Sequence, residues 1–589
     1  MKKKLILFCY ALSLILVGCG NKVNTSFEDF TNNLFIQNIS ENTINLHYSL
    51  YNPGRYGISD MQPSLGDVSA SSKASSDYLK QCISQLEQCD HDSLSVSQKL
   101  DYDVIYDSIS TDLKLSGYAL YDDMLSPSNG TQSELPVLLA EYDFRAPKDV
   151  DDYLLLLSDI PRYFDQIISF EKEKSKAGLF MSDDLCNAVI EQCEDFIYHP
   201  SDNILIKTFN KKISGFDGMA SSEKDTYKSQ NEEIVYNYVI PAYKKMISEL
   251  TKLLGTGKND LGLCYFKDGS DYYEKLVYRK TGCDDPIDKI YESIEARQHD
   301  DLAACAMLLS QNPDLISECD KDLSMKDEDE MLLKLQSSIK DDFPSIDNTD
   351  VNHTLSYVDE SLQDSLAPAF YLTAPLDDYT NNKIYINPSS KYDGLELFTT
   401  LAHEGYPGHL YQTVKSYEYG LSPIRSILNY GGYTEGWATY VEMLSYAYAG
   451  IDPDAAQFLK CNKDFSLSLY AASDIGIHYY GWDFNKLCDF WKDYGITDVN
   501  ALKEIQRLII SSPGNYLKYY VGYLQIEKLK NSQKETLGGD YSDIEFHKAF
   551  LKIGPAPFHI IEKYINNPGI SSSPDTVIRL KAVCIYPFY

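Results

Sequence analysis

The chain has 589 residues, is 43% hydrophobic, and carries 53 Lys and Arg against 87 Asp and Glu, a net charge of −34. This length suits two or three average domains or one large helical enzyme. An anionic surface repels a phosphate backbone, so we expect no nucleic-acid partner. The composition does not indicate an oligomeric state.

The first residues have the pattern of an export signal. A basic start at Lys2 to Lys4 is followed by an apolar run from Leu5 to Val17 and then by Cys19. The ending "LVGC" resembles a lipobox, in which the Cys is lipidated. We expect a lipoprotein signal peptide over residues 1–18 and a lipidated tether over 19–28, which holds the protein outside the cytoplasm on the cell membrane. The alternative is an uncleaved signal anchor with an incidental Cys.

Most of the chain after the tether has the pattern of helices. Apolar residues recur every three or four positions in Ser76–Cys89, Val150–Lys174 and Asn231–Leu254. Stretches rich in Ser, Gly and Pro predict loops over Met61–Asp77 and Leu125–Leu135. The sequence therefore predicts a mainly α fold.

Strand signals are sparse. The segment Asn382–Ser389 alternates and ends at a Pro, which predicts a short strand over Lys383–Ile386. No linker separates an N-terminal half, to about residue 285, from the motif-bearing half, 286–589. We therefore expect residues 29–589 to form one helical catalytic unit.

A His-Glu pair typical of zinc peptidases lies in "FTTLAHEGYPGHLYQ", but its partner His is displaced. In the usual His-Glu-x-x-His helix, both imidazoles share one face and the Glu acts as general base. Here His409 follows His403 by six residues, which advances about 600° and leaves the two rings about 120° apart on an ideal helix. An unbroken helix could not aim both rings at one ion.

The residues between the two His favour a break in the helix. Pro407 has no N–H, and its ring clashes with the carbonyl of His403 in a helix. Gly405 and Gly408 permit unusual dihedral angles. We expect the helix to end or bulge here, which would swing His409 back towards His403.

A zinc site needs a third ligand and an open position. Glu435, in "NYGGYTEGWATYVEML", begins a helix 26 residues after His409, and Glu442 lies seven residues further on the same face. Two His followed by a Glu on a second helix is the arrangement of gluzincins. A Glu near a helix start is also favoured by the helix dipole alone. A cysteine zinc site is not expected, because no Cys-x-x-Cys occurs.

Several segments in consistent order resemble one family. They are "APAFYLTAPLDD", "KIYINP", "TTLAHEGYPGHLYQ", "YTEGWATYVEML", "SDIGIHYYGW", "PGNYLKYYVG" and "FHKAFLKIGPAP", between about Ala367 and Pro557. The resemblance is to the bacterial domain of unknown function 885 family, largely helical proteins and often lipoproteins, regarded as metallopeptidases related to carboxypeptidase Taq-like gluzincins. The first half matches only in helical style and in "DYYEKLVYRKTG", Asp271–Gly282.

The resemblance implies a zinc site and a general base. Carried over by position, His403, His409 and Glu435 hold Zn²⁺, and Glu404 is the base. Glu442 supports this set from behind.

Two further positions follow from the resemblance in "SDIGIH". Asp474 and His478 are one helical turn apart, so the Asp can orient the imidazole. His478 would stabilise the oxyanion or replace His409 as a ligand. A packed helix His is the alternative.

The remaining candidates concern substrate binding. Tyr519 is placed to donate to the tetrahedral oxyanion, unless it is a core Tyr. Asn515 stands where the family usually has Gln. Arg425 is a candidate for a substrate carboxylate, or it pairs with acidic neighbours. Tyr385 lies in the predicted strand at Lys383–Ile386, which we expect to be an edge strand that pairs with the substrate main chain.

Together these features predict a membrane-anchored, extracytoplasmic zinc peptidase in which Glu404 activates a metal-bound water. One alternative is a surface lipoprotein that binds peptides or glycans without catalysis. Another is an amidase of cell-wall peptides. The sequence does not distinguish endopeptidase from exopeptidase activity.

Overall fold

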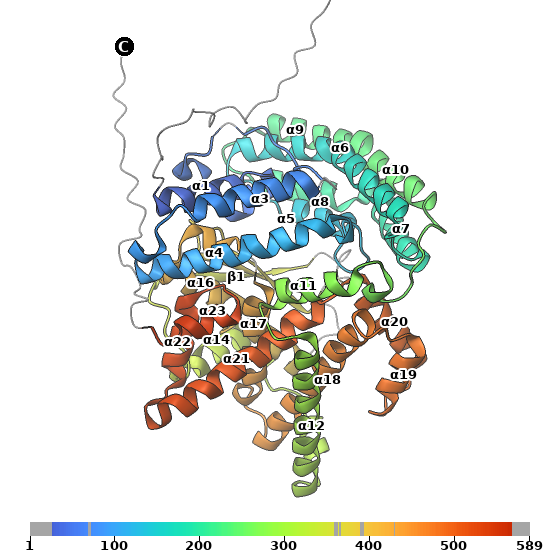
Figure 1. Ribbon diagram of the computed structural model, residues 1–589. Coiled ribbons are helices and arrows are strands. Elements are labelled where there is room, and N and C mark those ends of the chain that lie inside the picture. The colour runs from blue at the N-terminus through green and yellow to red at the C-terminus, as the bar shows by residue number, and fades with distance from the viewer. Residues whose placement is uncertain are drawn as a thin grey trace, which may run out of the picture.

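The computed structural model describes residues 26–59, 61–68, 72–358, 363, 367–388, 394–428 and 430–567. The predicted signal peptide and Cys19 lie outside these residues. Within them, no helix is both long and apolar enough to cross a membrane. The fold is mainly α, as the sequence predicts (Figure 1).

The N-terminal half is a set of helices that lie across the upper part of the molecule in Figure 1. Their bounds are α1 Phe27–Ile39, α2 Thr43–Ser49, α3 Ser72–Leu86, α4 Val96–Leu115, α5 Thr131–Glu141, α6 Pro147–Ala177, α7 Asp183–Tyr198, α8 Ile204–Gly215, α9 Ser221–Ile234, α10 Ile240–Thr251 and α11 Gly269–Thr281. A π-helical turn, Val235–Val239, joins α9 to α10.

The three helices predicted from apolar spacing are present as α3, α6 and the α9–α10 pair. The two predicted loops are shorter than expected. Helix α3 begins at Ser72 and α5 at Thr131, inside the stretches assigned as loops. Ser and Thr are common at helix starts as well as in loops, so their abundance does not separate the two.

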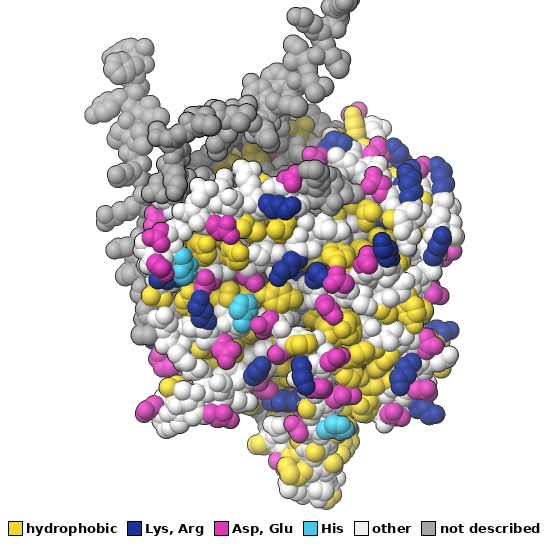
Figure 2. Space-filling model, viewed as in Figure 1, with side chains coloured by type: hydrophobic (Ala, Val, Ile, Leu, Met, Phe, Trp, Pro, Cys, Tyr) yellow, Lys and Arg dark blue, Asp and Glu magenta, His cyan; other side chains and the backbone are white. Residues whose placement is uncertain are grey.

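The motif-bearing half contains the remaining helices and a small sheet. The helices are α12 Ile287–Gln311, α13 Leu315–Cys319, α14 Glu328–Ser338, α15 Gly394–Glu404, α16 His409–Glu418, α17 Gly431–Ser445, α18 Pro453–His478, α19 Phe484–Lys492, α20 Val499–Ser511, α21 Asn515–Leu537, α22 Asp543–Ile553 and α23 Phe558–Tyr564. On the face in Figure 2, Lys and Arg side chains are scattered among acidic ones and do not form one basic patch.

The sheet corrects one expectation. Its strands are β1 Asn352–Tyr357, β2 Ala369–Leu372 and β3 Asn381–Ile386, in the order β1-β3-β2. The predicted strand is therefore the central one, parallel to β1 and antiparallel to β2. The edge strand beside the site helix α15 is β2, and the sequence analysis predicted neither β2 nor β1.

The two largest apolar clusters lie mainly in different halves of the chain. Residues of α5 to α10, such as Tyr153 and Tyr243, form one apolar cluster. The other cluster is built around α15, α17 and α21, and it also takes Val104 from α4 and Tyr273 from α11. Helices α4 and α11 of the first half therefore pack into the core that surrounds the motifs.

A close helix crossing organises this second core. Gly436 of α17 and Gly522 of α21 meet so closely that a Cβ on Gly436 would lie 2.4 Å from the carbonyl carbon of Gly522. Only a residue without a side chain allows the two backbones to approach this far. The crossing brings Glu435, which precedes Gly436, next to the start of α21.

Candidate metal centre

The chain breaks between the two His, as predicted. Helix α15 ends at Glu404 and α16 begins at His409. A Cβ on Gly408 would lie 1.8 Å from the carbonyl oxygen of His403. Gly408 therefore lets the connection fold back against the end of α15, and this places His409 beside His403.

The connection is held from the side by the neighbouring helix. The peptide bond between Tyr406 and Pro407 is cis. The indole N–H of Trp437, a fully buried residue of α17, donates to the carbonyl of Pro407 over 2.9 Å. The "EGWA" segment thus supplies both Glu435 and the residue that fixes the break.

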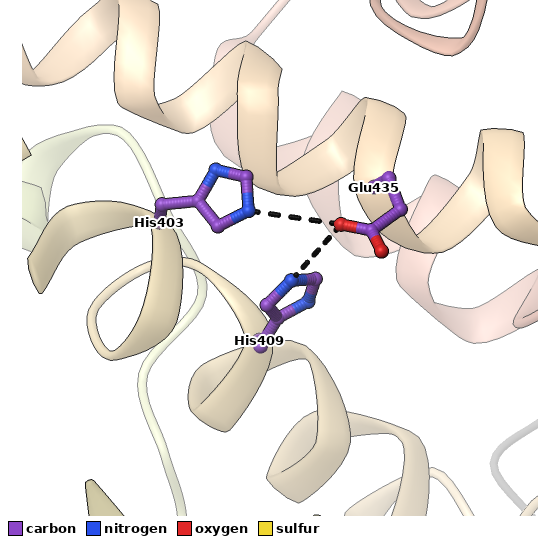
Figure 3. A group of neighbouring side chains, drawn as sticks. All are labelled: His403, His409 and Glu435. Atoms are coloured by element: carbon purple, nitrogen blue, oxygen red, sulfur yellow. Dashed lines mark ion pairs between the residues drawn. The ribbon is translucent and has the colours of Figure 1, made fainter. Parts of the chain in front are cut away.

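Three side chains converge across this break (Figure 3). Nε2 of His409 lies 3.4 Å from Oε2 of Glu435, and Nε2 of His403 lies 3.7 Å from the same oxygen. The two imidazole rings stand nearly perpendicular, with centroids 4.9 Å apart. Among the described residues, these three form the one group of His, Cys, Asp or Glu able to hold a metal ion.

The donor set fits zinc. One ligand atom from each residue lies within 4.8 Å of the others. Ligands on a tetrahedral zinc ion with bonds of about 2.0–2.1 Å lie about 3.3 Å apart, close to the separations from Glu435. Two imidazoles and one carboxylate, with a fourth position open, are the ligands of a hydrolytic zinc site.

Glu435 presents one oxygen to the two His and the other to a Lys. Its Oε1 accepts from Nζ of Lys518 over 3.1 Å, while Oε2 faces the imidazoles. Lys518 lies on α21, which the Gly436–Gly522 crossing places here. The Lys therefore holds the carboxylate so that a single oxygen points at the two rings.

Glu442 contacts the ring nitrogen of His403 that does not face Glu435. Nδ1 of His403 is 3.0 Å from Oε2 of Glu442, and Lys463 of α18 is 3.1 Å from the other carboxylate oxygen. A carboxylate on the far nitrogen fixes the tautomer of a metal-binding imidazole and leaves its other nitrogen free for the ion. The supporting role predicted for Glu442 has the geometry it requires.

The charges of the cluster shift its titration. Burial opposes the charge on His403, but hydrogen bonds to Glu435 and Glu442 outweigh it and raise the pKa of His403 to about 10. Burial raises the pKa of Glu442, but Lys463 and His403 outweigh this and bring it to about 2. Burial is outweighed at Glu435 also, because His403 and His409 lower its pKa well below the usual value. The lowered pKa values keep Glu435 and Glu442 ionised, and the raised pKa of His403 reflects the attraction of these carboxylates for a positive charge at this position.

Glu404 lies at the edge of the cluster. Its Oε1 is 4.0 Å from Nε2 of His403, and its Oε2 accepts from the backbone N–H of Tyr371 over 2.8 Å. Tyr371 belongs to β2, so the edge strand directs an amide at the predicted general base. The sequence analysis named Glu404 but missed this contact, although Tyr371 lies within the quoted "APAFYLTAPLDD" segment.

Tyr519 is also at the site. Its ring centroid is 6.2 Å from that of His403. Burial and the carboxylates of Glu435 and Glu404 raise the pKa of Tyr519 above its usual value, so the phenol keeps its proton at neutral pH. Asn515, one helical turn before it, is half-buried at the start of α21, and its substrate-binding role stays a prediction.

His478 does not belong to the cluster, and this corrects the prediction. It is buried at the end of α18, its Nδ1 accepts from the N–H of Leu263, and its Nε2 lies 3.0 Å from the carbonyl of Ile509. Both ring nitrogens are therefore occupied by backbone groups. Asp474 does not orient the ring by a hydrogen bond, because its carboxylate accepts from the Tyr273 hydroxyl and from the N–H of Gly514.

Arg425 and Tyr385 are also structural. Arg425 is fully buried, donates to the carbonyls of Ile553 and Pro555, and pairs with Asp101 over 3.0 Å, so it pairs with an acidic neighbour instead of a substrate. The hydroxyl of Tyr385 donates to Glu141 and joins β3 to the N-terminal half. Their predicted roles in substrate binding are wrong, because internal groups already occupy their polar atoms.

The sequence analysis missed the two Lys residues that hold the carboxylates. Lys518 directly precedes Tyr519 in the quoted "PGNYLKYYVG" segment, which was a usable signal. Lys463 lies outside every quoted segment, and no spacing pattern pointed to it.

Comparison with known proteins places the chain in a family. The family described as "Bacterial protein of unknown function (DUF885)" matches residues 54–565. No curated protein matches the sequence. A structure titled as the putative lipoprotein from Colwellia psychrerythraea is 17% identical, with a TM-score of 0.80 over 92% of this chain and 99% of that chain. A putative lipoprotein of unknown function from Shewanella oneidensis is 18% identical, with a TM-score of 0.63 over 91% of this chain and 99% of that chain. These two structures share the fold, and the family match spans most of the sequence, so the chain belongs to the DUF885 family of bacterial proteins.

Proposed function

We propose that the protein is a zinc-dependent peptidase that acts outside the cytoplasm. The observation that carries this proposal is the convergence of His403, His409 and Glu435, with the Glu404 carboxylate at the edge of the cluster. The carboxylate of Glu442 on the far side of His403 supports it, because such a contact prepares an imidazole for a metal.

Zn²⁺ bound by His403, His409 and Glu435 would polarise the scissile carbonyl and acidify a water molecule. Glu404 then takes a proton from the attacking water and delivers it to the leaving amine. Tyr519 keeps its phenolic proton and donates it in a hydrogen bond to the developing oxyanion.

The outer edge of β2 is the proposed place for the substrate main chain. Among the described residues, β2 pairs only with β3, and the N–H of Tyr371 donates to Glu404 instead of to β3. An extended peptide that pairs with this edge would run past the general base. This assigns to β2 the role that the sequence analysis gave to the central strand.

Lipid anchoring completes the proposal. The two structural relatives are titled putative lipoproteins, and the present sequence has the lipobox-like ending at Cys19. Acyl chains on Cys19 would hold the protein at the membrane surface. The variant Cys19→Ser should then appear in the soluble extracytoplasmic fraction, and unchanged membrane association would indicate an uncleaved signal anchor.

The variant Glu404→Gln tests the catalytic assignment. It keeps the shape of the side chain and the three proposed ligands, but removes the base. We expect zinc content to stay the same and hydrolysis of a panel of linear peptides to fall at least about 100-fold. Glu396→Gln, at an exposed position of the same helix, is the matched control and should retain activity. Near-parental hydrolysis by Glu404→Gln would refute the assignment.

A further inference from the structure

The last turn of α11 lies against the helix that carries Glu435. A Cβ on Gly432 would lie 1.9 Å from the carbonyl oxygen of Thr281, and one on Gly431 would lie 2.8 Å from that of Lys280. These approaches leave no room for a side chain at either of these two positions of α17. The "DYYEKLVYRKTG" segment of the first half, which includes Lys280, is therefore fixed beside the metal centre.

The side chain of Lys280 lies near that of Lys518. Its Cδ is 3.3 Å from the position that a Cβ on Gly514 would occupy, at the residue that precedes α21. Lys518 is one turn into α21, and its Cβ and Cδ are 3.2 and 3.3 Å from the corresponding position on Gly431. Two Lys side chains thus lie together where α11, α17 and α21 meet.

The two ammonium groups have different partners. Nζ of Lys518 binds Oε1 of Glu435. Lys280 is half-buried, and among the described residues its ammonium has neither a carboxylate within 4.0 Å nor a hydrogen bond. The buried carboxylate of Asp474 is nearby but already accepts from Tyr273 and Gly514.

An unpaired cation at this position is costly. The chain has 87 acidic and 53 basic residues, so a carboxylate partner is easily available to most Lys side chains. Burial and the neighbouring charge of Lys518 lower the pKa of Lys280, against the attraction of Asp474 and Asp123. A half-buried ammonium without a direct partner is poised to accept an anion.

We propose that Lys280 forms a carboxylate-binding subsite beside the metal centre and receives a carboxylate of the peptide substrate. This carboxylate is either the C-terminal group or an acidic side chain. Lys518 and the amides at the start of α21, where Gly514 provides no side-chain cap, add to the positive field. The inference rests on the proposed peptidase function and deepens it, because it names a charged feature that the substrate carries.

Binding to a variant that does not turn over separates this inference from the proposed activity. The zinc-loaded, full-length Glu404→Gln variant is titrated calorimetrically with short peptides of one core sequence. One has a free C-terminus, one is amidated, and two further amides carry an internal Glu or Gln. We expect one carboxylate peptide to bind at least about tenfold more tightly than its neutral counterpart. The peptide with this preference identifies which carboxylate is recognised.

The same titration with Lys280→Met added tests the residue. The preference should fall to less than about twofold, while binding of the neutral peptides stays unchanged. Lys280→Arg should keep most of the preference. The matched control is Lys275→Met on the same helix, because Lys275 already pairs with Asp271, and it should change nothing.

Two results would overturn the inference. One is that the Glu404→Gln variant with Lys280 intact prefers neither carboxylate peptide, whether or not the peptides bind. This result does not depend on how the Lys280 variants fold. The other is that folded Lys280→Met keeps the preference, which would mean that the metal or another group binds the carboxylate. Hydrolysis measured on the unmodified enzyme judges the peptidase proposal separately.

Discussion

Two regions of the motif-bearing half place a His at the end of a helix, and they differ in what the ring nitrogens meet. At the α15–α16 break, His403 and His409 turn their Nε2 atoms towards one carboxylate oxygen of Glu435. At the end of α18, the nitrogens of His478 meet a backbone N–H and a backbone carbonyl. The first arrangement directs two ring nitrogens at one point, where an ion could replace the proton on His403, and the second uses the ring to join segments of the core.

The difference lies in the surrounding backbone. At the break, Gly408 removes the side chain that would block the turn, and Trp437 satisfies the carbonyl of Pro407. At His478, the N–H of Leu263 and the carbonyl of Ile509 at the end of α20 meet the ring directly. A helix His is thus available to a metal ion only where no backbone group already binds its ring nitrogens.

The largest effect should come from adding a side chain at the break between α15 and α16. In Gly408→Ala, the added methyl would overlap the carbonyl of His403, so the connection must open and His409 must move away from Glu435. We expect zinc affinity, measured by competition with a chelator, to fall at least about 100-fold while circular dichroism stays helical. Gly215→Ala, where a Cβ meets nothing within 4 Å, is the control. Parental affinity in Gly408→Ala would show that the break does not position His409.

A smaller loss should follow from weakening the support behind His403. Glu442→Gln keeps an acceptor near Nδ1 but removes the charge and the ion pair with Lys463. Loss of such a partner typically lowers metal affinity about 10–100-fold. Competition titration measures the change, and an unaltered affinity would mean that Glu442 serves only to pair Lys463.

Proton competition at His403 should tune zinc affinity with pH. The pKa of His403, raised from 6.5 to about 10 in the metal-free fold, means that its contribution to stability is complete below pH 6.5 and is lost as pH rises through about 10. Zinc must displace this proton, so below about pH 10 the apparent affinity should rise about tenfold per pH unit from this group.

Competition titrations at about pH 7 and about pH 8 measure this rise. The pKa of Glu442, lowered from 4.5 to about 2, affects folding stability in the opposite direction. Its stabilising contribution is present above pH 4.5 and is lost as pH falls towards 2. A zinc affinity independent of pH over this range would indicate that His403 carries no proton in the metal-free protein.

No effect on zinc is expected from the other His. His478→Ala would leave the N–H of Leu263 unpaired in the core and would remove one of the two hydrogen bonds of the Ile509 carbonyl, which also accepts from the N–H of Ser512. We expect it to lower the free energy of unfolding by about 2–4 kcal/mol, measured by urea denaturation, and to leave zinc stoichiometry unchanged. Loss of zinc from a folded His478→Ala variant would instead return this residue to the metal site.

The sequence predicts the break and the convergence of its flanking residues because these depend on local chemistry. Pro407 and two Gly residues must interrupt a helix wherever it packs. The spacing to Glu435 requires only that a second helix lie against the break, as α17 does through its packing on α15 and the Trp437–Pro407 hydrogen bond.

The failures depend on contacts between distant segments. The place of Lys383–Ile386 at the centre of the sheet is decided by its hydrogen-bonded pairing with β1 and β2, which a local sequence pattern does not reveal, and neither strand was predicted. The burial of Arg425 depends on carbonyls more than a hundred residues away. The Lys residues on Glu435 and Glu442 come from α21 and α18, so no motif around the two Glu residues predicts them.

The most direct test of the account is the zinc content of the purified full-length protein, compared with His409→Ala and His478→Ala prepared in the same way. Elemental analysis after dialysis against a weak chelator measures the zinc bound to each chain. The account predicts about one zinc ion per parent chain, its loss in His409→Ala and its retention in His478→Ala. A parent chain without zinc, or a His409→Ala variant that keeps it, would contradict the central claim that the α15–α16 break builds a metal site.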